Sequence, residues 1–153
     1  SKWIKAIDKC VDTGVLFVID YGYASQEYFL HDRSDGTLVC IHKHKSNFDP
    51  LSNIGNQDIS SFVNFSHLKN LSLNTDLTVS GFLSQSSFLI NLNILDIHQS
   101  KNYSADEAQI ESNKLKNILL PNTMGELFKV LVMQKNIDVE LKSTKEFNQM
   151  HKL

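Results

Sequence analysis

Residues 15–23 read Val-Leu-Phe-Val-Ile-Asp-Tyr-Gly-Tyr, and the rest of the chain is arranged around this stretch. A short continuous apolar run of this kind is typical of a strand covered on both faces, as in a parallel sheet flanked by helices. Ligands of such sheets bind beyond the carboxyl ends of the strands, where we expect Asp20, Tyr21 and Gly22 to lie. Gly22 would permit a sharp turn and a close approach of the backbone to a ligand. A simpler interpretation stays open, in which the strand only builds the core and Asp20 caps the next turn.

Composition and charge narrow the class of protein. A chain of 153 residues is long enough for one domain with a real core. Its net charge of −2 argues against a broad nucleic-acid surface. No apolar run approaches the roughly 20 residues of a membrane helix, and the first residues lack the layout of a signal peptide. We therefore expect a cytoplasmic protein that binds neither nucleic acid nor membrane, with Cys10 and Cys40 reduced.

The pattern of apolar residues predicts an alternation of helices and strands. Residues 2–11 have helical spacing, and residues 24–57 form a long excursion that we interpret as a lid or binding loop with a short strand at 37–41. Asp58 is expected to cap a helix. After it we expect a strand at 77–83 and a helix from about Ser86. The next helix should begin with a capping box at Ser104–Glu107 and end at Pro121. A turn at 124–126, a strand at 127–133, a weak edge strand at 137–141 and a polar tail at 143–153 that frays complete the expected order. Residues 1–142 thus form the domain.

Several chemical motifs are weighed against simpler roles. His42 and His44 would face the same side of a strand, but a metal site needs further ligands and none is evident, so we favour a solvated or loop-anchoring role. Asp20 and Asp58, if both line the crevice, could accept an arginine side chain, whereas otherwise each caps a local turn. The sequence contains no Gly-x-Ser-x-Gly elbow, no Gly-x-Gly-x-x-Gly turn and no phosphate loop. A hydrolase triad and a self-contained nucleotide site therefore have no support.

A series of short motifs, kept in order along nearly the whole chain, carries a family resemblance. They are Gly14–Tyr23 with its Asp-Tyr-Gly end, Gly36-Thr37-Leu38 followed by His44, Gly55-Asn56-Gln57-Asp58-Ile59-Ser60, Gln85 with Phe88-Leu89, Pro121, Met124-Gly125-Glu126 and Phe128–Leu131. In these the chain resembles the C-terminal half of the MidA family of S-adenosylmethionine-dependent methyltransferases, which includes the mitochondrial complex I assembly arginine methyltransferase. Each motif is weak alone, and their common order makes the signal specific.

The resemblance implies an α/β fold, the C-terminal half of a class I methyltransferase (Rossmann-like) sheet with an antiparallel last strand and a long loop insertion. Residues 15–19 would be the fifth strand, 77–83 the sixth and 127–133 the seventh. It implies methyl transfer to an arginine of a protein substrate or respiratory-complex subunit, in the bacterial cytoplasm or, for eukaryotic relatives, in mitochondria. Asp20, Tyr21 and Gly22 would form the catalytic end, and Thr37, His44, Gln57 and Asp58 the substrate channel. S-adenosylmethionine would bind in the full-length parent, and none is expected on this chain alone.

Some positions depart from the family pattern. Phe62 and Asn64 stand where relatives tend to have His and Asp in a helix, and Asn93 stands where a glycine is expected. These departures, with the missing cofactor turn, keep a rival interpretation open: a non-catalytic protein-interaction module on a methyltransferase scaffold. If the chain is a fragment, the strand at 15–19 lacks its neighbour, and an apolar strand with an open edge tends to pair with another chain. We therefore expect self-association through this edge.

Overall fold

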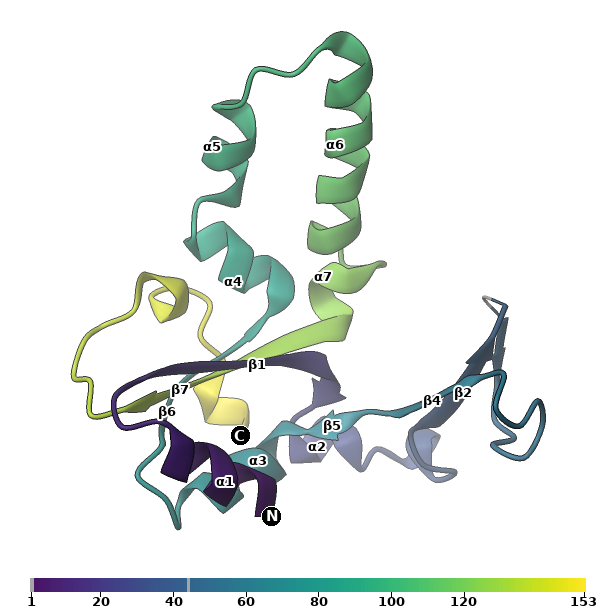
Figure 1. Ribbon diagram of the computed structural model, residues 1–153, viewed down its shortest axis with the longest axis vertical. Coiled ribbons are helices and arrows are strands. Elements are labelled where there is room, and N and C mark those ends of the chain that lie inside the picture. The colour runs from purple at the N-terminus through teal and green to yellow at the C-terminus, as the bar shows by residue number, and fades with distance from the viewer. Residues whose placement is uncertain (1, 44) are drawn as a thin grey trace.

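A mixed four-stranded sheet organises the computed structural model, which describes residues 2–43 and 45–153. Its centre is β1 (Gly14–Tyr23), which contains the whole apolar run and continues through the Asp-Tyr-Gly end. The strand order is β5-β1-β7-β6, and the other strands are β5 (Val63–Asn64), β6 (Thr78–Ser84) and β7 (Phe128–Lys135). β7 runs antiparallel to both β1 and β6 (Figure 1). The strands expected as fifth, sixth and seventh are thus present in one sheet, and the last of them is antiparallel as expected.

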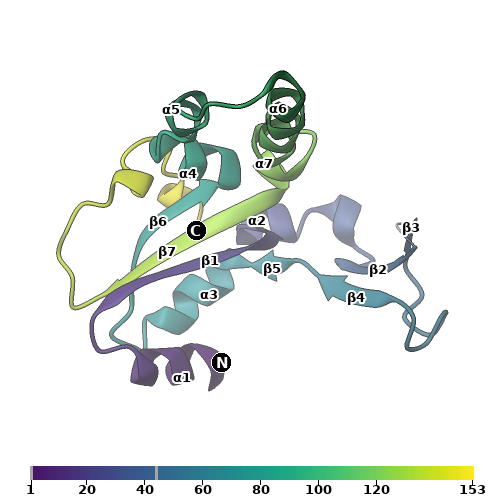
Figure 2. The same cartoon turned by 45° about the horizontal axis from the view of Figure 1, so that its top comes forward.

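Helices cover both faces of this sheet, as Figure 2 shows. On one face lie α1 (Lys2–Cys10) and α3 (Phe65–Ser72), and on the other α4 (Gln85–Asn91) and α7 (Met124–Leu127). From α4 and α7, the helices α5 (Ile94–Gln99) and α6 (Ala105–Leu119) extend away from the sheet. Each face has its own core cluster, and β7 contributes to both because successive side chains of a strand point to opposite faces. Leu131 and Met133 join the cluster around Ile4 and Phe65, whereas Val130 and Val132 join the cluster around Leu83 and Phe88.

A second, three-stranded sheet projects beyond the carboxyl end of β1, at the right of Figure 1. We call this sheet and its loop at 48–57 the flap. Its strands, in the spatial order β3-β2-β4, are β2 (Leu38–His42), β3 (Lys45–Asn47) and β4 (Asp58–Ser61). Between β1 and the flap lie α2 (Ser25–Tyr28) and a single 3-10 turn, η1 (His31–Arg33). The excursion at 24–57 is therefore more regular than its sequence indicates.

The expectation that Asp58 caps a helix is wrong. Asp58 begins β4 and lies opposite Ile41, and the helix begins seven positions later, at Phe65. Asn64 is the actual N-cap, because its Oδ1 accepts a hydrogen bond from the backbone N of His67 at 2.9 Å. The apolar residues after Asp58 have roughly helical spacing, but pairing with β2, distant in sequence, prevails over that local pattern.

The elements after β6 agree more closely with the expectations from the sequence. Ser104 and Glu107 form the expected capping box, α6 ends before Pro121, and the expected turn at 124–126 is the short helix α7. The edge strand expected at 137–141 is wrong: these residues form no strand and lead into the 3-10 turn η2 (Lys142–Thr144). The chain leaves the sheet at Asn136, whose φ of 51° turns the backbone away from the strand direction.

The polar tail lies against the free side of β6 instead of fraying. The backbone N of Phe82 donates to Asn148 Oδ1 at 3.0 Å, and Asn148 Nδ2 donates to the carbonyl of Ser80 at 3.2 Å. The backbone N of Gln149 donates to the carbonyl of Phe82 at 2.7 Å. The chain ends with the 3-10 turn η3 (Met150–Lys152), and Met150 and Leu153 pack against the first core cluster. The sequence-based expectation fails here because a polar segment docks mainly through hydrogen bonds.

No helix within residues 2–43 and 45–153 is both long enough and apolar enough to cross a bilayer.

Candidate functional site

The candidate site is the carboxyl end of β1, where Asp20 lies half-buried. Its Oδ1 accepts a hydrogen bond from the backbone N of Tyr21 at 2.8 Å. Asp20 lies opposite Lys129 in the sheet, but Lys129 Nζ pairs with Glu126 Oε2 at 3.3 Å. Among the described residues no ion pair reaches the Asp20 carboxylate. A half-buried carboxylate without a cationic partner retains the capacity to bind one.

Aromatic rings from three parts of the chain meet around Tyr21. The ring of Phe128, at the start of β7, lies 4.0 Å from the Tyr21 ring between centroids, and the ring of Phe62 lies 6.1 Å from it. Phe62 also contacts Tyr23, with centroids 5.5 Å apart. Such ring contacts hold the strand end, β7 and the base of the flap in one fixed arrangement.

Gly22 serves the packing of two strands. It pairs with Val63 of β5, which runs parallel to β1 here. A Cβ added at Gly22 would collide with the carbonyl oxygen of Val63 and lie 2.8 Å from the Phe65 ring. The expected sharp turn at Gly22 is wrong, because the strand continues to Tyr23. The close approach that glycine permits is to β5.

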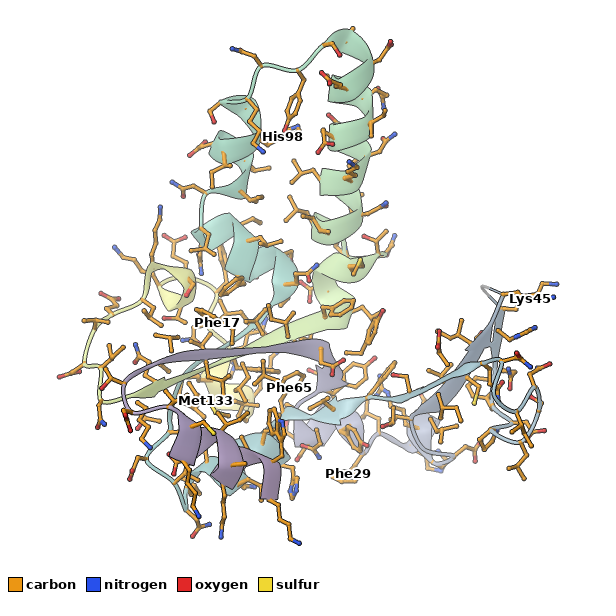
Figure 3. All side chains as sticks on the ribbon, viewed as in Figure 1. Phe17, Phe29, Lys45, Phe65, His98 and Met133 are labelled. Atoms are coloured by element: carbon orange, nitrogen blue, oxygen red, sulfur yellow. The ribbon has the colours of Figure 1, made fainter. Side chains whose placement is uncertain are left out.

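One side of β1 is open. Gly14–Tyr21 pair with β7 on one side, whereas on the other side β5 meets only Gly22 and Tyr23. In the described ranges no further strand pairs with that side, which we call the open edge. Phe17 and Ile19 on this strand remain 43% and 49% exposed although they are large and apolar. In Figure 3 Phe17 lies on the α4 side of the sheet, where its ring meets Phe88, and Phe65 and Met133 lie on the other.

The expected substrate-channel residues take different places in the flap. Thr37 Oγ1 accepts from the backbone N of Phe62 at 3.2 Å and thereby ties the flap to the aromatic cluster. Gln57 accepts from Asn47 Nδ2 and donates to the carbonyl of Asp49, both at 3.1 Å, so its amide braces the flap loop. Asp58 is exposed on β4. His44 lies outside the described residues. Of the described members of this set, Thr37 is the one that connects to the strand end, through Phe62 and its contact with Tyr21.

Arg33 is a site residue that the sequence interpretation missed. Its guanidinium carbon lies 4.0 Å from the centroid of the Tyr23 ring, and its Nη1 donates to the carbonyl of Glu27 at 2.5 Å. A guanidinium over an aromatic face is held by the negative potential of the ring. The only signal in the sequence is a single basic residue three positions before Gly36, in a stretch without periodicity, so nothing local marks it out.

The histidine and cysteine residues form no metal site in the described structure. His42 Nδ1 lies 2.5 Å from the carbonyl of Asn56, which fits a loop-anchoring role. Cys40 is buried and Cys10 exposed, and both are free thiols. Across 2–43 and 45–153 no three His, Cys, Asp or Glu side chains are grouped closely enough to hold a metal ion.

The fold and the strand-end site define the class of protein: a mixed α/β domain of the methyltransferase type with an antiparallel last strand. Residues 1–83 match a family described as "Putative S-adenosyl-L-methionine-dependent methyltransferase". The match covers more than half of the chain, and the chain belongs to this family. A search of curated proteins found no match.

Two solved structures from Burkholderia thailandensis resemble the chain closely. One is an uncharacterized protein of the COG1565 superfamily, with 30% identity, a TM-score of 0.93, and coverage of 99% of this chain and 41% of that one. The other belongs to the same superfamily and is bound to S-adenosyl-homocysteine, with 31% identity, a TM-score of 0.94, and coverage of 99% and 40%. The expected fold class is confirmed. The chain spans about two fifths of the length of these relatives.

Proposed function

We propose that these residues are the C-terminal part of the methyl-transfer domain of a MidA-type methyltransferase, related to the mitochondrial complex I assembly arginine methyltransferase. The order of the motifs from Gly14 to Leu131 supports this assignment. So does the sheet, in which the last strand, β7, lies between β1 and β6 and runs antiparallel to both. The observation that carries the proposal is the match of nearly the whole chain to two fifths of a relative bound to S-adenosyl-homocysteine.

The chain does not by itself fit a whole S-adenosylmethionine molecule. Its sequence contains no glycine-rich turn that could approach the adenosine closely. At the strand end, the space beside Gly22 is already occupied by the backbone of β5. The residues that grip the methyl donor would then come from another part of the full-length parent, and this chain alone would be inactive. We therefore assign the chain a role toward the acceptor.

The proposed acceptor is an arginine of a protein substrate. A guanidinium stays protonated at all physiological pH values, so an enzyme that modifies it must orient and balance a positive charge. Asp20 offers a half-buried carboxylate with no ion pair in the described residues. Tyr21 and Gly22 fix the strand end on which Asp20 lies, through the aromatic cluster and through β5. Asp20 would hold the guanidinium by charge-assisted hydrogen bonds.

The test is Asp20→Asn in a full-length enzyme that contains these residues. We expect transfer of labelled methyl groups to protein arginine to fall about 100-fold, because a preorganised charge at a reacting centre is typically worth that much. Asp12→Asn, at the opposite end of β1, is the matched control and should retain full activity. An unchanged rate in Asp20→Asn would remove Asp20 from the mechanism.

The alternative is a non-catalytic interaction module, which the departures from the family pattern favour. The structure makes two of them conservative. Asn64 caps α3, a role that an aspartate performs equally well. Asn93 has a φ of 60°, in the left-handed region. Glycine adopts this conformation freely, and asparagine adopts it more readily than most other residues. A coding frame upstream of Ser1 that encodes a glycine-rich turn would favour the enzyme, and a start codon there the module.

We also propose that the isolated chain associates with itself through the open edge of β1. The unpaired backbone groups of Gly14–Tyr21 and the half-exposed side chains of Phe17 and Ile19 support this. Unpaired strand edges of this kind are templates for pairing with another chain.

A further inference from the structure

Two adjoining cavities, which share four lining residues, form a groove between the flap and the segment at 32–37. Both are lined by Arg33, Gly36, Leu38 and Phe48. The outer cavity, of about 350 Å³, adds Asp32 and Asp35. The inner cavity, of about 220 Å³, adds Thr37, Val39 and Phe62. We call the two together the flap groove.

The inner end of the flap groove reaches the candidate site. Phe62 lines the groove and contacts the rings of both Tyr21 and Tyr23. Arg33 lines it as well, but its guanidinium is held by the Tyr23 ring and the carbonyl of Glu27. A segment lying in the groove would therefore have one end beside the aromatic cluster that carries the end of β1.

The outer end carries carboxylates whose charge is unbalanced. Asp32 and Asp35 are both exposed, and in the described part of the chain neither has an ion pair. Among the described residues that line the groove, the one cation is Arg33, and its guanidinium is engaged by the Tyr23 ring. The outer half is thus complementary to a positively charged ligand.

The flap loop adds a preformed apolar surface. Phe48, Leu51 and Ile54 are 79%, 76% and 74% exposed. The loop that carries them is nevertheless ordered by its own hydrogen bonds, including Asp49 N to Asn47 Oδ1 at 3.0 Å and Leu51 N to Asp49 Oδ1 at 2.9 Å. Large apolar side chains on a loop that is already ordered are typical of binding surfaces, because little further ordering is needed on association.

From these features we propose that the flap groove binds an extended, basic and apolar segment of the protein substrate. The groove would bind residues next to the acceptor arginine, with Asp32 and Asp35 contacting basic side chains and Phe48 an apolar one. The proposal rests on the proposed function for the identity of the partner, but its binding chemistry follows from the charges and exposed side chains of the groove. Asp32, Asp35 and Phe48 are specificity residues in this scheme.

The test measures binding without a methyl donor, by fluorescence anisotropy of a fluorescein-labelled peptide, Gly-Leu-Arg-Gly-Phe-Arg-Gly-Leu. A second peptide has citrulline in place of both arginines, which removes the charge with little change of shape. We expect the double variant Asp32→Asn/Asp35→Asn to weaken binding of the arginine peptide about fivefold, the range of two exposed ion pairs. Its affinity for the citrulline peptide should not change. Phe48→Ser should weaken binding of both peptides about tenfold.

Matched controls make the same chemical changes elsewhere. Asp12→Asn/Asp138→Asn removes two exposed carboxylates, and Leu73→Ser removes a side chain that is 74% exposed. Both should bind the arginine peptide like the unmodified chain. Equal weakening by the control pair, or no peptide binding at all, overturns the proposal. Binding of phosphatidylglycerol vesicles that Phe48→Ser abolishes, without peptide binding, also overturns it and identifies a membrane surface.

The two proposals fail separately. Peptide binding with the expected variant pattern, but no methyl transfer by the full-length enzyme, would contradict the proposed function and leave the groove as a peptide site. Methyl transfer that depends on Asp20 but is unaffected by Asp32→Asn/Asp35→Asn, in KM as in kcat, would contradict the groove and leave the function.

Discussion

One outer edge of the main sheet is covered by other parts of the chain, and the other is open. The outer side of β6 is covered by the chain's own tail, in which the Asn148 amide bonds to β6 as a backbone peptide would. The outer side of β1 is uncovered along Gly14–Tyr21 and presents the half-exposed Phe17 and Ile19. Proteins generally cover or charge the edges of their sheets, because open edges pair with other chains. The uncovered margin of β1 therefore marks a surface that another strand is suited to complete.

The largest expected effect is on folding stability and comes from a substitution of Gly22, where the open edge of β1 ends. In Gly22→Ala the added methyl group meets the carbonyl of Val63, which is backbone and cannot rotate away, so β5 must separate from β1. We expect a loss of about 3 kcal/mol in the free energy of unfolding, at the upper end of overpacking effects. Chemical denaturation measures it. Gly14→Ala, whose added atom would lie 3.5 Å from Val11 Cγ1, is the control and should change stability by less than about 1 kcal/mol. Equal stability of the two variants would contradict the prediction.

The next largest loss of stability is expected from Asn148→Ala, which removes the amide that bonds to the outer side of β6. This variant leaves the backbone N of Phe82 and the carbonyl of Ser80 without their partner, and unsatisfied buried groups typically cost about 2 kcal/mol. Urea denaturation should show that loss. Gln109→Ala removes an exposed amide contact on α6 and should change stability by less than about 0.5 kcal/mol. If Asn148→Ala is as stable as this control, the tail does not protect β6.

A charge introduced on the open edge of β1 tests whether this edge mediates self-association. Ile19→Lys should raise the apparent dissociation constant of self-association about tenfold, because a lysine at a strand edge opposes pairing. Since Ile19 is 49% exposed, folding stability should change little. Size-exclusion chromatography with light scattering over a concentration series gives the constant, with Leu73→Lys as the control. A chain that stays monomeric at high concentration before any substitution would contradict the association itself.

The smallest effect concerns an ion pair at the end of β7, between the two margins. Lys135 Nζ lies 2.9 Å from Asp8 Oδ1, and this hydrogen bond lowers the pKa of Asp8 below its ordinary value of 3.8 and raises the pKa of Lys135. A lowered carboxyl pKa in the folded state gives stability that is present above that ordinary value and is lost as pH falls through the folded-state pKa. Asp8→Asn should lower Tm by a few degrees at pH 7.

Thermal unfolding at several pH values checks this sign. The difference in Tm between the unmodified chain and Asp8→Asn should shrink as the pH falls from 3.8 through the lowered folded-state pKa, because Asp8 is then protonated first in the unfolded state and finally in both states. Asp106→Asn, at an exposed position in the first turn of α6, is the control. A difference that grows in acid would mean that the pair does not stabilise the fold.

Local patterns identified much of the fold, and two of their failures share a cause. The strand at 15–19, the capping box at Ser104 and the stop at Pro121 depend on neighbouring residues and are found as expected. The helix expected from Asp58 and the frayed tail fail because β2 and β6, distant in the chain, supply hydrogen-bond partners that no local pattern reveals. In the candidate site, Asp20 and Tyr21 were named from the strand end, whereas Arg33 and Phe128 reach it only through folding.

The sequence by itself determined the central strand, the order of the motifs and hence the family, because apolar runs, caps and short motifs are properties of neighbouring residues. Only the tertiary structure decided that Gly22 is required by β5, that the tail closes one margin of the sheet, and that Arg33, Phe48 and Phe62 share a groove beside β1. The physical reason is the same in each case. Contacts between distant segments depend on where the chain has been brought in space, and this is encoded in the packing of the whole domain.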